Sequence, residues 1–167
     1  MAAKTGTYTL INAGAISGTV TEMVFTSIPA TYTDLIIVVE PTAGSLADTA
    51  IQFNSDTGAN YSRTYLTGNG TTASSGRNSG DTRIRLDYYG PTGGSSGIQI
   101  INIMDYANTT TYKTVLNRCS NASYGTDANV GLWRSTAAIS TVRVYCDGGG
   151  NWTAGNIKLY GIEAGNL

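Results

Sequence analysis

The stretch that decides the fold class is Thr141-Val-Arg-Val-Tyr-Cys-Asp-Gly-Gly-Gly-Asn151. In its first half Val142, Val144 and Cys146 point to one side, and a hydroxyl, a guanidinium and a phenol alternate with them on the other side. A period of two with polar groups on one side indicates a β-strand with one buried and one solvated face. The Asp-Gly-Gly-Gly-Asn segment contains residues that accept a positive φ, so we predict a hairpin loop leading into a last strand at residues 156–162.

The rest of the chain repeats this combination of short apolar segments and turn residues. Gly, Thr, Ser and Asn interrupt the sequence too often for a long helix, and β-branched residues fill most apolar positions. Further strands are predicted near residues 7–11, 20–25, 34–40, 50–54, 61–66, 82–88, 97–105, 112–120 and 130–133. This spacing predicts an all-β fold, an antiparallel, jelly-roll-like β-sandwich of about ten short strands without significant helix.

Three segments carry more specific predictions. Residues 35–39 and 98–104 are apolar on both faces, which indicates central strands covered twice, by a second sheet or by another subunit. Residues 82–88 alternate, and this strand is predicted to bury Ile84, Leu86 and Tyr88 and to expose Arg83, Arg85 and Asp87. Residues 68–81 are rich in Gly, Ser, Thr and Asn and are predicted to form the most flexible loop.

The composition restricts the kinds of partner. The 167 residues carry a net charge of −1 and only 13% charged residues, where about a quarter is usual. A nucleic-acid surface needs clustered Lys and Arg, so none is expected. The longest apolar run, at 35–39, is far shorter than a membrane span, and the N-terminus has no signal-peptide pattern. We therefore expect a soluble protein made in the cytoplasm, with a flexible arm at 1–6 and one domain at 7–167.

Side chains suited to catalysis are scarce. Histidine is absent, which removes the commonest general base and metal ligand, and no paired-carboxylate or nucleophile motif is present. Cys119 and Cys146 are too few for a disulfide framework, and each lies in an apolar run. We predict two buried free thiols, with a single bridge as the alternative. We expect a non-enzymatic protein with no cofactor and no catalytic, cofactor-binding or metal-binding residues.

Three short motifs match functional patterns by letter. Asp56-Thr-Gly58 spells the aspartic-protease triplet, but its flanks are polar and a turn explains both Asp and Gly. The alternation of polar residues over 54–60 resembles half of a calcium loop without the closing Glu, and calcium stays an alternative to the turn. Gly68-Asn-Gly-Thr-Thr-Ala73 matches the relaxed dinucleotide fingerprint, yet the residues that follow cannot open the required helix.

Aromatic residues are the remaining candidates for contact. Six tyrosines lie in the central and later parts of the chain: Tyr88, Tyr89, Tyr106, Tyr112, Tyr124 and Tyr145. Tyrosine suits protein interfaces and stacking against sugar rings, although half-buried strand positions explain most of them. Trp133 is predicted to lie in the core, and Trp152 is predicted to form a lid on the sandwich end.

Several stretches together resemble one family. They are Phe25-Thr-Ser-Ile-Pro-Ala-Thr-Tyr-Thr-Asp-Leu35, Ile51-Gln-Phe-Asn-Ser-Asp-Thr-Gly-Ala-Asn-Tyr-Ser62, Gly131-Leu-Trp-Arg-Ser-Thr-Ala-Ala-Ile139, Asp147-Gly-Gly-Gly-Asn-Trp152 and Lys158-Leu-Tyr-Gly-Ile162. The chain is similar to the small virion structural proteins of tailed bacteriophages, of the type common in cyanophages and other aquatic phages. The resemblance implies a β-sandwich that acts as a capsid decoration (cement) or tail-fibre protein, and it supplies no catalytic residues.

Two functional hypotheses follow from these observations. The first is a homo-oligomeric, trimeric cement protein that binds the major capsid protein on the capsid surface, because the chain is a weakly charged β domain without a fibre shaft. The second is a tail-fibre or receptor-binding, lectin-like module that contacts host glycans through tyrosines and the 68–81 loop.

Overall fold

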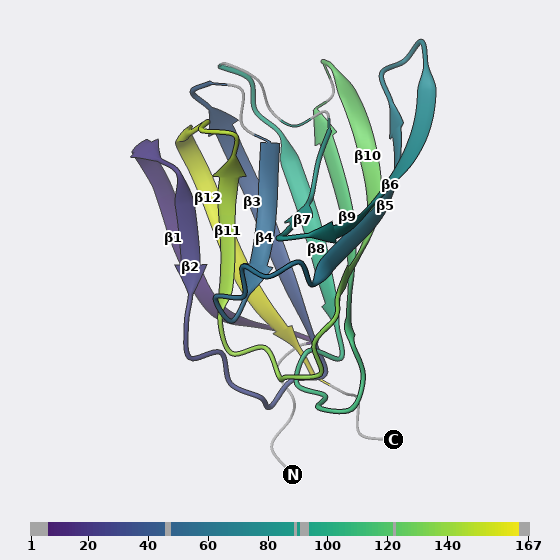
Figure 1. The fold of residues 1–167 in the computed structure, drawn as a ribbon. Helices are drawn as coiled ribbons and strands as arrows, with labels where there is room; N and C mark the ends of the chain where they lie inside the picture. The colour runs from purple at the N-terminus through teal and green to yellow at the C-terminus, as the bar shows by residue number, and fades with distance from the viewer. Residues whose placement is uncertain (1–6, 46–47, 89, 91–93, 122, 164–167) are drawn as a thin grey trace.

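The computed structural model describes residues 7–45, 48–88, 90, 94–121 and 123–163, so the expected arm at 1–6 lies outside the described residues. These residues form twelve β-strands in two antiparallel sheets that pack face to face (Figure 1). The predicted all-β sandwich is therefore confirmed, whereas the finer jelly-roll connectivity stays a prediction. Within the described ranges, no helix is long and apolar enough to cross a membrane.

The two sheets differ in size. The larger has eight strands in the order β1 (Tyr8–Val20), β12 (Trp152–Ile162), β3 (Asp34–Ala43), β8 (Ile98–Met104), β9 (Lys113–Asn121), β10 (Gly125–Trp133), β5 (Tyr61–Gly68) and β6 (Ala73–Asp81). The smaller has four strands in the order β2 (Glu22–Phe25), β11 (Val142–Asp147), β4 (Asp48–Phe53) and β7 (Ile84–Arg85). The smaller sheet therefore covers one face of the larger sheet, and none of the described strands lies over the other face (Figure 1).

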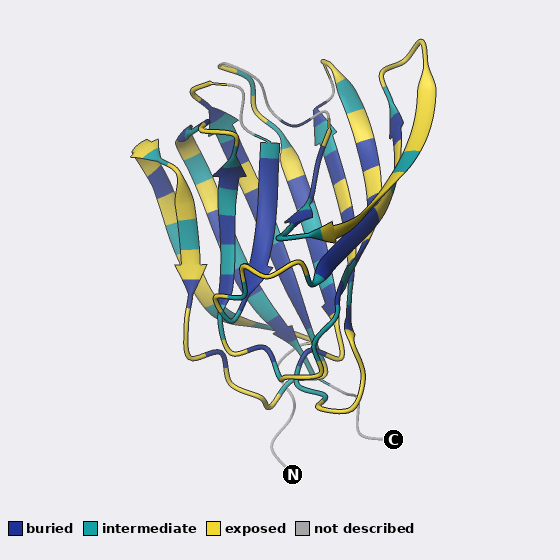
Figure 2. Ribbon diagram, in the orientation of Figure 1, coloured by how far each residue is buried: buried dark blue, intermediate teal, exposed yellow. Residues whose placement is uncertain are grey.

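The core lies between the sheets and follows the alternation of the strands. Leu35, Ile37 and Val39 of β3 are fully buried in it, as are Val142 and Val144 of β11. Figure 2 shows the contrast between β4, which is buried over most of its length, and the edge strand β6, which is mostly exposed. Burial of about 25 cal/mol per Å² of apolar surface accounts for the packing of the sheets.

The two segments with apolar groups on both faces are neighbouring strands within the eight-stranded sheet. Strands β3 and β8 pair with each other through Leu35↔Ile103 and Ile37↔Ile101, and each has a further strand on its other side. The prediction of central strands is confirmed. The second sheet covers only their inner faces. On the outer faces Ile36 is buried, whereas Ile98 and Met104 are 39% and 38% exposed.

The loop at 147–151 is not the predicted hairpin. Gly148 and Gly149 do have positive φ angles of 81° and 87°. However, β11 pairs with β2 and β4, whereas β12 pairs with β1 and β3, so the loop crosses from the smaller to the larger sheet. Glycines with positive φ suit both a hairpin turn and a connection between two sheets. The burial of Trp152 at the start of β12 favours the connection from the smaller to the larger sheet.

The segment 68–81, predicted as a flexible loop, contains strand β6. Its residues pair with β5 from Gly68↔Ala73 to Tyr61↔Asp81, and Asn69 closes the turn by accepting hydrogen bonds from the amides of Thr71 and Thr72. The prediction was wrong because the ladder of backbone hydrogen bonds along β5 compensates for the low strand propensity of Gly and Ser. The side chains of this edge strand remain mostly exposed.

The predicted strand at 82–88 is shorter than expected. Only Ile84–Arg85 forms β7, which pairs with β4. Ile84 and Leu86 are buried as predicted, but Tyr88 is exposed and Asp87 is buried. The predicted alternation of buried and exposed residues fails from Asp87 onward. Polar side chains of the larger sheet, and not a neighbouring strand, form hydrogen bonds to the backbone of residues 86–88.

Candidate functional site

The two outer faces of the sandwich differ in chemistry. Over the smaller sheet, Arg143 forms an ion pair with Glu22 at 2.6 Å and donates a hydrogen bond to Gln52 at 2.9 Å. At the end of the same sheet, Arg83 forms an ion pair with Asp147 at 2.8 Å. This face is covered by polar groups that satisfy one another and water, as is usual for a solvated sheet.

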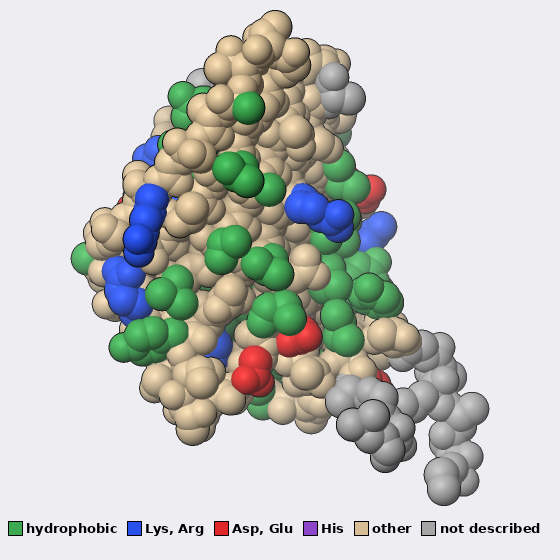
Figure 3. Space-filling model, turned by 90° about the vertical axis from the view of Figure 1, so that its right-hand side faces the viewer, with side chains coloured by type: hydrophobic (Ala, Val, Ile, Leu, Met, Phe, Trp, Pro, Cys, Tyr) green, Lys and Arg blue, Asp and Glu red, His purple; other side chains and the backbone are tan. Residues whose placement is uncertain are grey.

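The outer face of the larger sheet is more apolar, and an ion pair on it joins Lys158 of β12 to Glu40 of β3 at 3.8 Å. Its exposed large hydrophobic side chains, between 38% and 63% exposed, form what we call the outer patch: Leu66, Ile98, Met104, Leu116 and Val130. Figure 3, seen from the side that carries β5 and β6, shows hydrophobic side chains spread over the surface with few charged side chains among them. Exposed apolar clusters of this kind mark interaction surfaces in soluble proteins.

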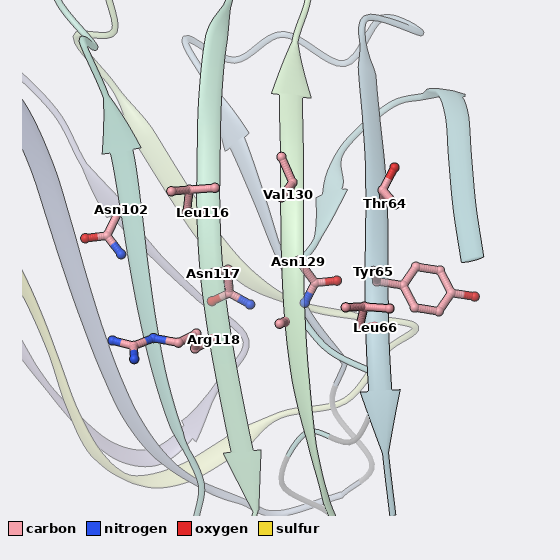
Figure 4. Close-up of a pocket in the computed structure, with 10 residues that line it drawn as sticks. Thr64, Tyr65, Leu66, Asn102, Leu116, Asn117, Arg118, Asn129 and Val130 are labelled. Carbon is pink, nitrogen blue, oxygen red and sulfur yellow. The ribbon is translucent and has the colours of Figure 1, made fainter. Parts of the chain in front are cut away.

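The strand register brings the outer patch together. Leu116 on β9 lies directly opposite Val130 on β10, and Val130 lies opposite Thr64 on β5. Leu66 lies opposite Ala128 in the neighbouring row. Figure 4 shows these side chains on three adjacent strands, where they line a shallow hollow of about 440 Å³.

One cation lies at the outer patch. Arg118 follows Leu116 on the same face of β9, opposite Ile100 on β8 and Ala128 on β10. It also lines the hollow, and Figure 4 shows its side chain lying over β8. The surface can therefore accept apolar groups over most of its width and one acidic group at Arg118.

Polar side chains on the inner side of the same strands hold residues 86–88. Asn117 and Asn129, paired across β9 and β10, both donate their side-chain N–H groups to the carbonyl oxygen of Leu86. Asp127 accepts a hydrogen bond from the amide of Tyr88 at 2.9 Å. These contacts satisfy buried backbone groups that have no ladder partner, which makes this segment rigid without a strand.

Asp87 lies at the centre of this polar layer. Its Oδ1 accepts a hydrogen bond from the amide of Thr49 at 2.9 Å, and its Oδ2 accepts one from Nε2 of Gln99 at 2.6 Å. The carboxyl is fully buried, and loss of solvation raises the pKa of Asp87 to about 8, with the nearby charges of Asp48 and Asp127 adding to the effect. The side chain is therefore largely protonated at neutral pH.

A second hollow, which we call the end pocket, opens at the end of the sandwich. It has a volume of about 350 Å³, and Asp87 lies in its wall. The other polar groups of the wall come from four places: Asp48 at the start of β4, Arg63 on β5, Asn78 on β6 and Arg85 on β7. Its aromatic residues are Tyr65, Tyr88 and Tyr124.

The tyrosines singled out in the sequence differ in burial and in location. Tyr106 is buried, and its hydroxyl donates to the carbonyl oxygen of Pro29. Tyr88, Tyr112 and Tyr124 are exposed, but only Tyr88 and Tyr124 belong to the end pocket. Tyr145 is half-buried over the smaller sheet, and Tyr89 lies outside the described residues.

Both tryptophans are buried. Trp133 lies in the core, as predicted, and its indole N–H donates to Asp56 at 2.7 Å. Trp152 is also buried in the core, so it is not an exposed anchor.

The Asp56-Thr57-Gly58 triplet forms the predicted turn. Asp56 Oδ1 accepts a hydrogen bond from the amide of Gly58 at 2.8 Å, and Oδ2 accepts from Asn60 and from the indole of Trp133. Although burial alone would raise it, these donors lower the pKa of the Asp56 carboxyl below its usual range. The Asp56 carboxylate thus links the turn to the core through Trp133. Within the described ranges, no group of three or more His, Cys, Asp or Glu is placed to hold a metal ion.

The two cysteines are free and buried, as predicted, and they do not form the alternative bridge. Loss of solvation raises the pKa of both thiols, that of Cys146 to about 12. A thiol reacts as the thiolate, so neither cysteine is a nucleophile at neutral pH.

The end pocket is the feature that sequence reasoning missed. The alternation over 82–88 placed Asp87 in water, and the loop predicted at 68–81 separated Asn78 from Arg63, which face each other across β5 and β6. The nearest signal in the sequence is Gly90-Pro91, which marks the end of the preceding strand within a few residues. Side chains from four strands and two connections cannot be grouped from such local signals.

Comparison with known proteins identifies no relative. No protein-family model, no curated protein and no solved structure matches this chain.

Proposed function

We propose that this chain is a non-enzymatic virion structural protein, which decorates the exterior of a tailed-phage capsid and binds the major capsid protein through the outer patch. The observation that carries the proposal is the uncovered apolar face of the larger sheet. A sheet whose two faces are both apolar at β3 and β8 is usually covered on both sides. Here the chain supplies one cover, and the capsid protein would supply the other.

The size of this face suits a stable interface. Eight strands at a spacing of about 4.8 Å, with a length like that of the seven-residue β8, present roughly 800 Å², and the outer patch lies on four of them, β8, β9, β10 and β5. About 800 Å² per partner is typical of specific protein–protein interfaces. A rigid sheet loses little conformational entropy on binding, which lowers one of the costs of association.

The chemistry of the face also suits a protein partner. The outer patch is aliphatic, and the charge nearest to it is Arg118, beside Leu116 on β9. An acidic group on the capsid protein that pairs with Arg118 would fix the orientation of docking. The ion-paired face of the smaller sheet would remain in water, since it gains nothing from desolvation.

The direct test is to add the purified protein to undecorated capsids assembled from the major capsid protein and to measure cosedimentation and heat resistance. The wild-type chain is expected to bind and to raise the temperature at which the shells break. The variant Leu116→Lys/Val130→Lys is expected to lose roughly a hundredfold in affinity, because two apolar contacts of about 1.5 kcal/mol each are removed and two charges would be desolvated.

The matched control is Val24→Lys. Val24 is an exposed valine of β2 on the smaller sheet, 46% exposed against 50% for Val130. This variant should bind like the wild-type chain. Equal binding by the double variant and the control would contradict the proposal, as would the failure of all three proteins to bind capsids.

The proposed oligomer is a trimer, and it can be measured by sedimentation equilibrium. Leu116→Lys/Val130→Lys should retain the mass of the wild-type oligomer, because the outer patch is assigned to the capsid. If the double variant were monomeric and still bound capsids, the outer patch would be the contact between copies of the chain and the proposed role of this face would be wrong.

A further inference from the structure

The end pocket has a fixed aromatic wall. The guanidinium of Arg63 lies 4.5 Å from the centre of the Tyr65 ring, and the ring of Tyr88 lies nearly parallel to that of Tyr65, with centroids 6.2 Å apart. Tyr88 is itself held by the hydrogen bond from its amide to Asp127. About half of the Tyr88 side chain remains exposed, so the stack presents a flat ring surface at the pocket.

Arg63 also orients the polar group beside this wall. Its Nε donates to Oδ1 of Asn78 at 3.2 Å, and its Nη1 donates to the carbonyl oxygens of Arg85 and Asp87 at 3.1 and 3.3 Å. The hydrogen bond from Arg63 therefore occupies the side-chain amide oxygen of Asn78. Its NH₂ group donates no hydrogen bond within the described ranges, and it is available to a ligand.

Asp48 supplies the complementary acceptor. It lies in the pocket wall at the start of β4, and its carboxylate accepts no hydrogen bond from the part of the chain that the structure describes. Partial burial raises the pKa of Asp48, and the nearby charges of Arg85 and Arg63 offset this effect only in part. A ligand that donates a hydrogen bond to this carboxylate would replace the hydrogen bonds from water that burial removed.

The charges of the pocket are already balanced. Arg63 uses Nε and Nη1 on protein acceptors, and Arg85 has Nε 3.0 Å from Asp147 Oδ2, which makes an ion pair without hydrogen-bond alignment. Asp87 is held by Thr49 and Gln99. The charges of Arg63 and Asp48 cancel within the pocket, so a charged ligand of either sign would face a like charge, whereas a neutral ligand with several hydroxyl groups would find an acceptor, a donor and a ring.

We propose that the end pocket binds one neutral sugar residue of a glycan, with Asp48 accepting hydrogen bonds from its hydroxyl groups, Asn78 donating to one of them, and Tyr88 packing against the C–H face of the ring. Aromatic rings and one carboxylate–amide pair are the groups that match a pyranose. The volume of about 350 Å³ lies within the range of small-molecule sites. This inference goes beyond capsid decoration, because Arg63 of the end pocket and Leu66 of the outer patch lie on opposite sides of β5, and the two hollows share Tyr65 alone.

The probe is a set of methyl glycosides of glucose, galactose, mannose and N-acetylglucosamine, with glucuronic acid as the charged comparison. Saturation-transfer NMR on the full chain measures binding at millimolar concentrations, and competition gives the relative affinity. At least one neutral glycoside is expected to bind more tightly than glucuronic acid. Binding of none of the neutral glycosides, or of the acid alone, would overturn the inference.

Two variants and a control locate the site. Asp48→Asn keeps the shape of the side chain but removes the charged acceptor, and Tyr88→Ala removes the ring wall, so each should weaken binding by about tenfold or more. Tyr112→Ala changes a tyrosine of similar exposure that lies outside the pocket, and it should bind like the wild-type chain. Equal binding by all three variants would refute the assignment.

The same proteins separate this inference from the capsid proposal. Asp48→Asn should bind undecorated capsids normally, and Leu116→Lys/Val130→Lys should bind the glycoside normally. Loss of glycoside binding in the Leu116→Lys/Val130→Lys variant would place the sugar on the outer face and overturn the end-pocket assignment, whatever the result with capsids.

Discussion

Among single residues, Asp87 is the one whose ionisation is most strongly coupled to the fold. Burial raises the pKa of its carboxyl to about 8 in the folded chain, whereas an unfolded chain leaves it near the ordinary value of 3.8. The folded state therefore binds one more proton than the unfolded state between these two values. Asp87 favours folding most at pH values below the unfolded pKa, and this contribution is lost as the pH rises toward 8.

We expect the free energy of unfolding to fall as the pH rises from 5 to 8, by up to about 1.4 kcal/mol per pH unit from this group. In Asp87→Asn the amide oxygen still accepts from the Thr49 amide, and its NH₂ can donate to Oε1 of Gln99, which has no donor within the described ranges. The variant should lose this pH dependence. Urea unfolding across the pH range measures the effect.

Asp56→Asn is the control with the opposite sign. Its hydrogen bonds lower the pKa of the Asp56 carboxyl, so its contribution is present above the unfolded pKa and is lost as the pH falls through the folded value. Asp56→Asn should therefore alter the acid side of the profile and leave the slope between pH 5 and 8 unchanged. A slope in Asp87→Asn equal to that of the wild-type chain would show that another group titrates in this range.

At the scale of single elements, strand β12 contains an irregularity that depends on glycine. The register between β12 and β3 shifts between Trp152 and Ala154, and Gly155 follows with a φ of 124°. A Cβ at Gly155 would overlap the carbonyl oxygen of Glu40 in β3. Because the obstacle is backbone in the middle of the larger sheet, it cannot move aside as a flexible side chain would.

Gly155→Ala is therefore expected to destabilise the fold by about 2–3 kcal/mol, the cost of a strained backbone plus a forced shift of β3. Gly148→Ala is the matched variant, since Gly148 has a φ of 81° but a Cβ there would meet no atom within 4 Å. Gly148→Ala should lower the free energy of unfolding by only about 1 kcal/mol, because the left-handed backbone is its one source of strain. Guanidinium unfolding of both variants measures the difference, and equal losses would mean that the contact with Glu40 is not decisive.

At the scale of the whole molecule, stability is expected to be graded across the larger sheet. Strands β3, β8 and β9 have neighbours on both sides and side chains in the core, whereas β6 pairs only with β5 and has mostly exposed side chains. Local opening costs least where few apolar contacts must break.

Amide hydrogen exchange followed by mass spectrometry should find the slowest exchange in β3, β8 and β9 and exchange at least about a hundredfold faster in β6, which corresponds to a difference of about 2.7 kcal/mol in opening free energy. Peptides of β2, short and exposed, provide an internal comparison from the smaller sheet. Protection of β6 equal to that of β8 would indicate that an additional partner covers this edge in solution.

The sequence by itself determined the fold class, the buried rows of the alternating strands and the double-sided apolar character of 35–39 and 98–104. These properties are local, because a period of two and the placement of Gly and Pro act over a few residues. Tertiary structure alone decided the sheet to which each strand belongs, the crossing at 147–151 and the pairing of β6 with β5. The first two depend on hydrogen-bond partners far apart in the chain, whereas β6 pairs with its neighbour in sequence although its residues have low strand propensity. The end pocket is the extreme case, since Asp48, Arg63, Asn78 and Asp87 meet only because three strands and a connection converge at one end of the sandwich.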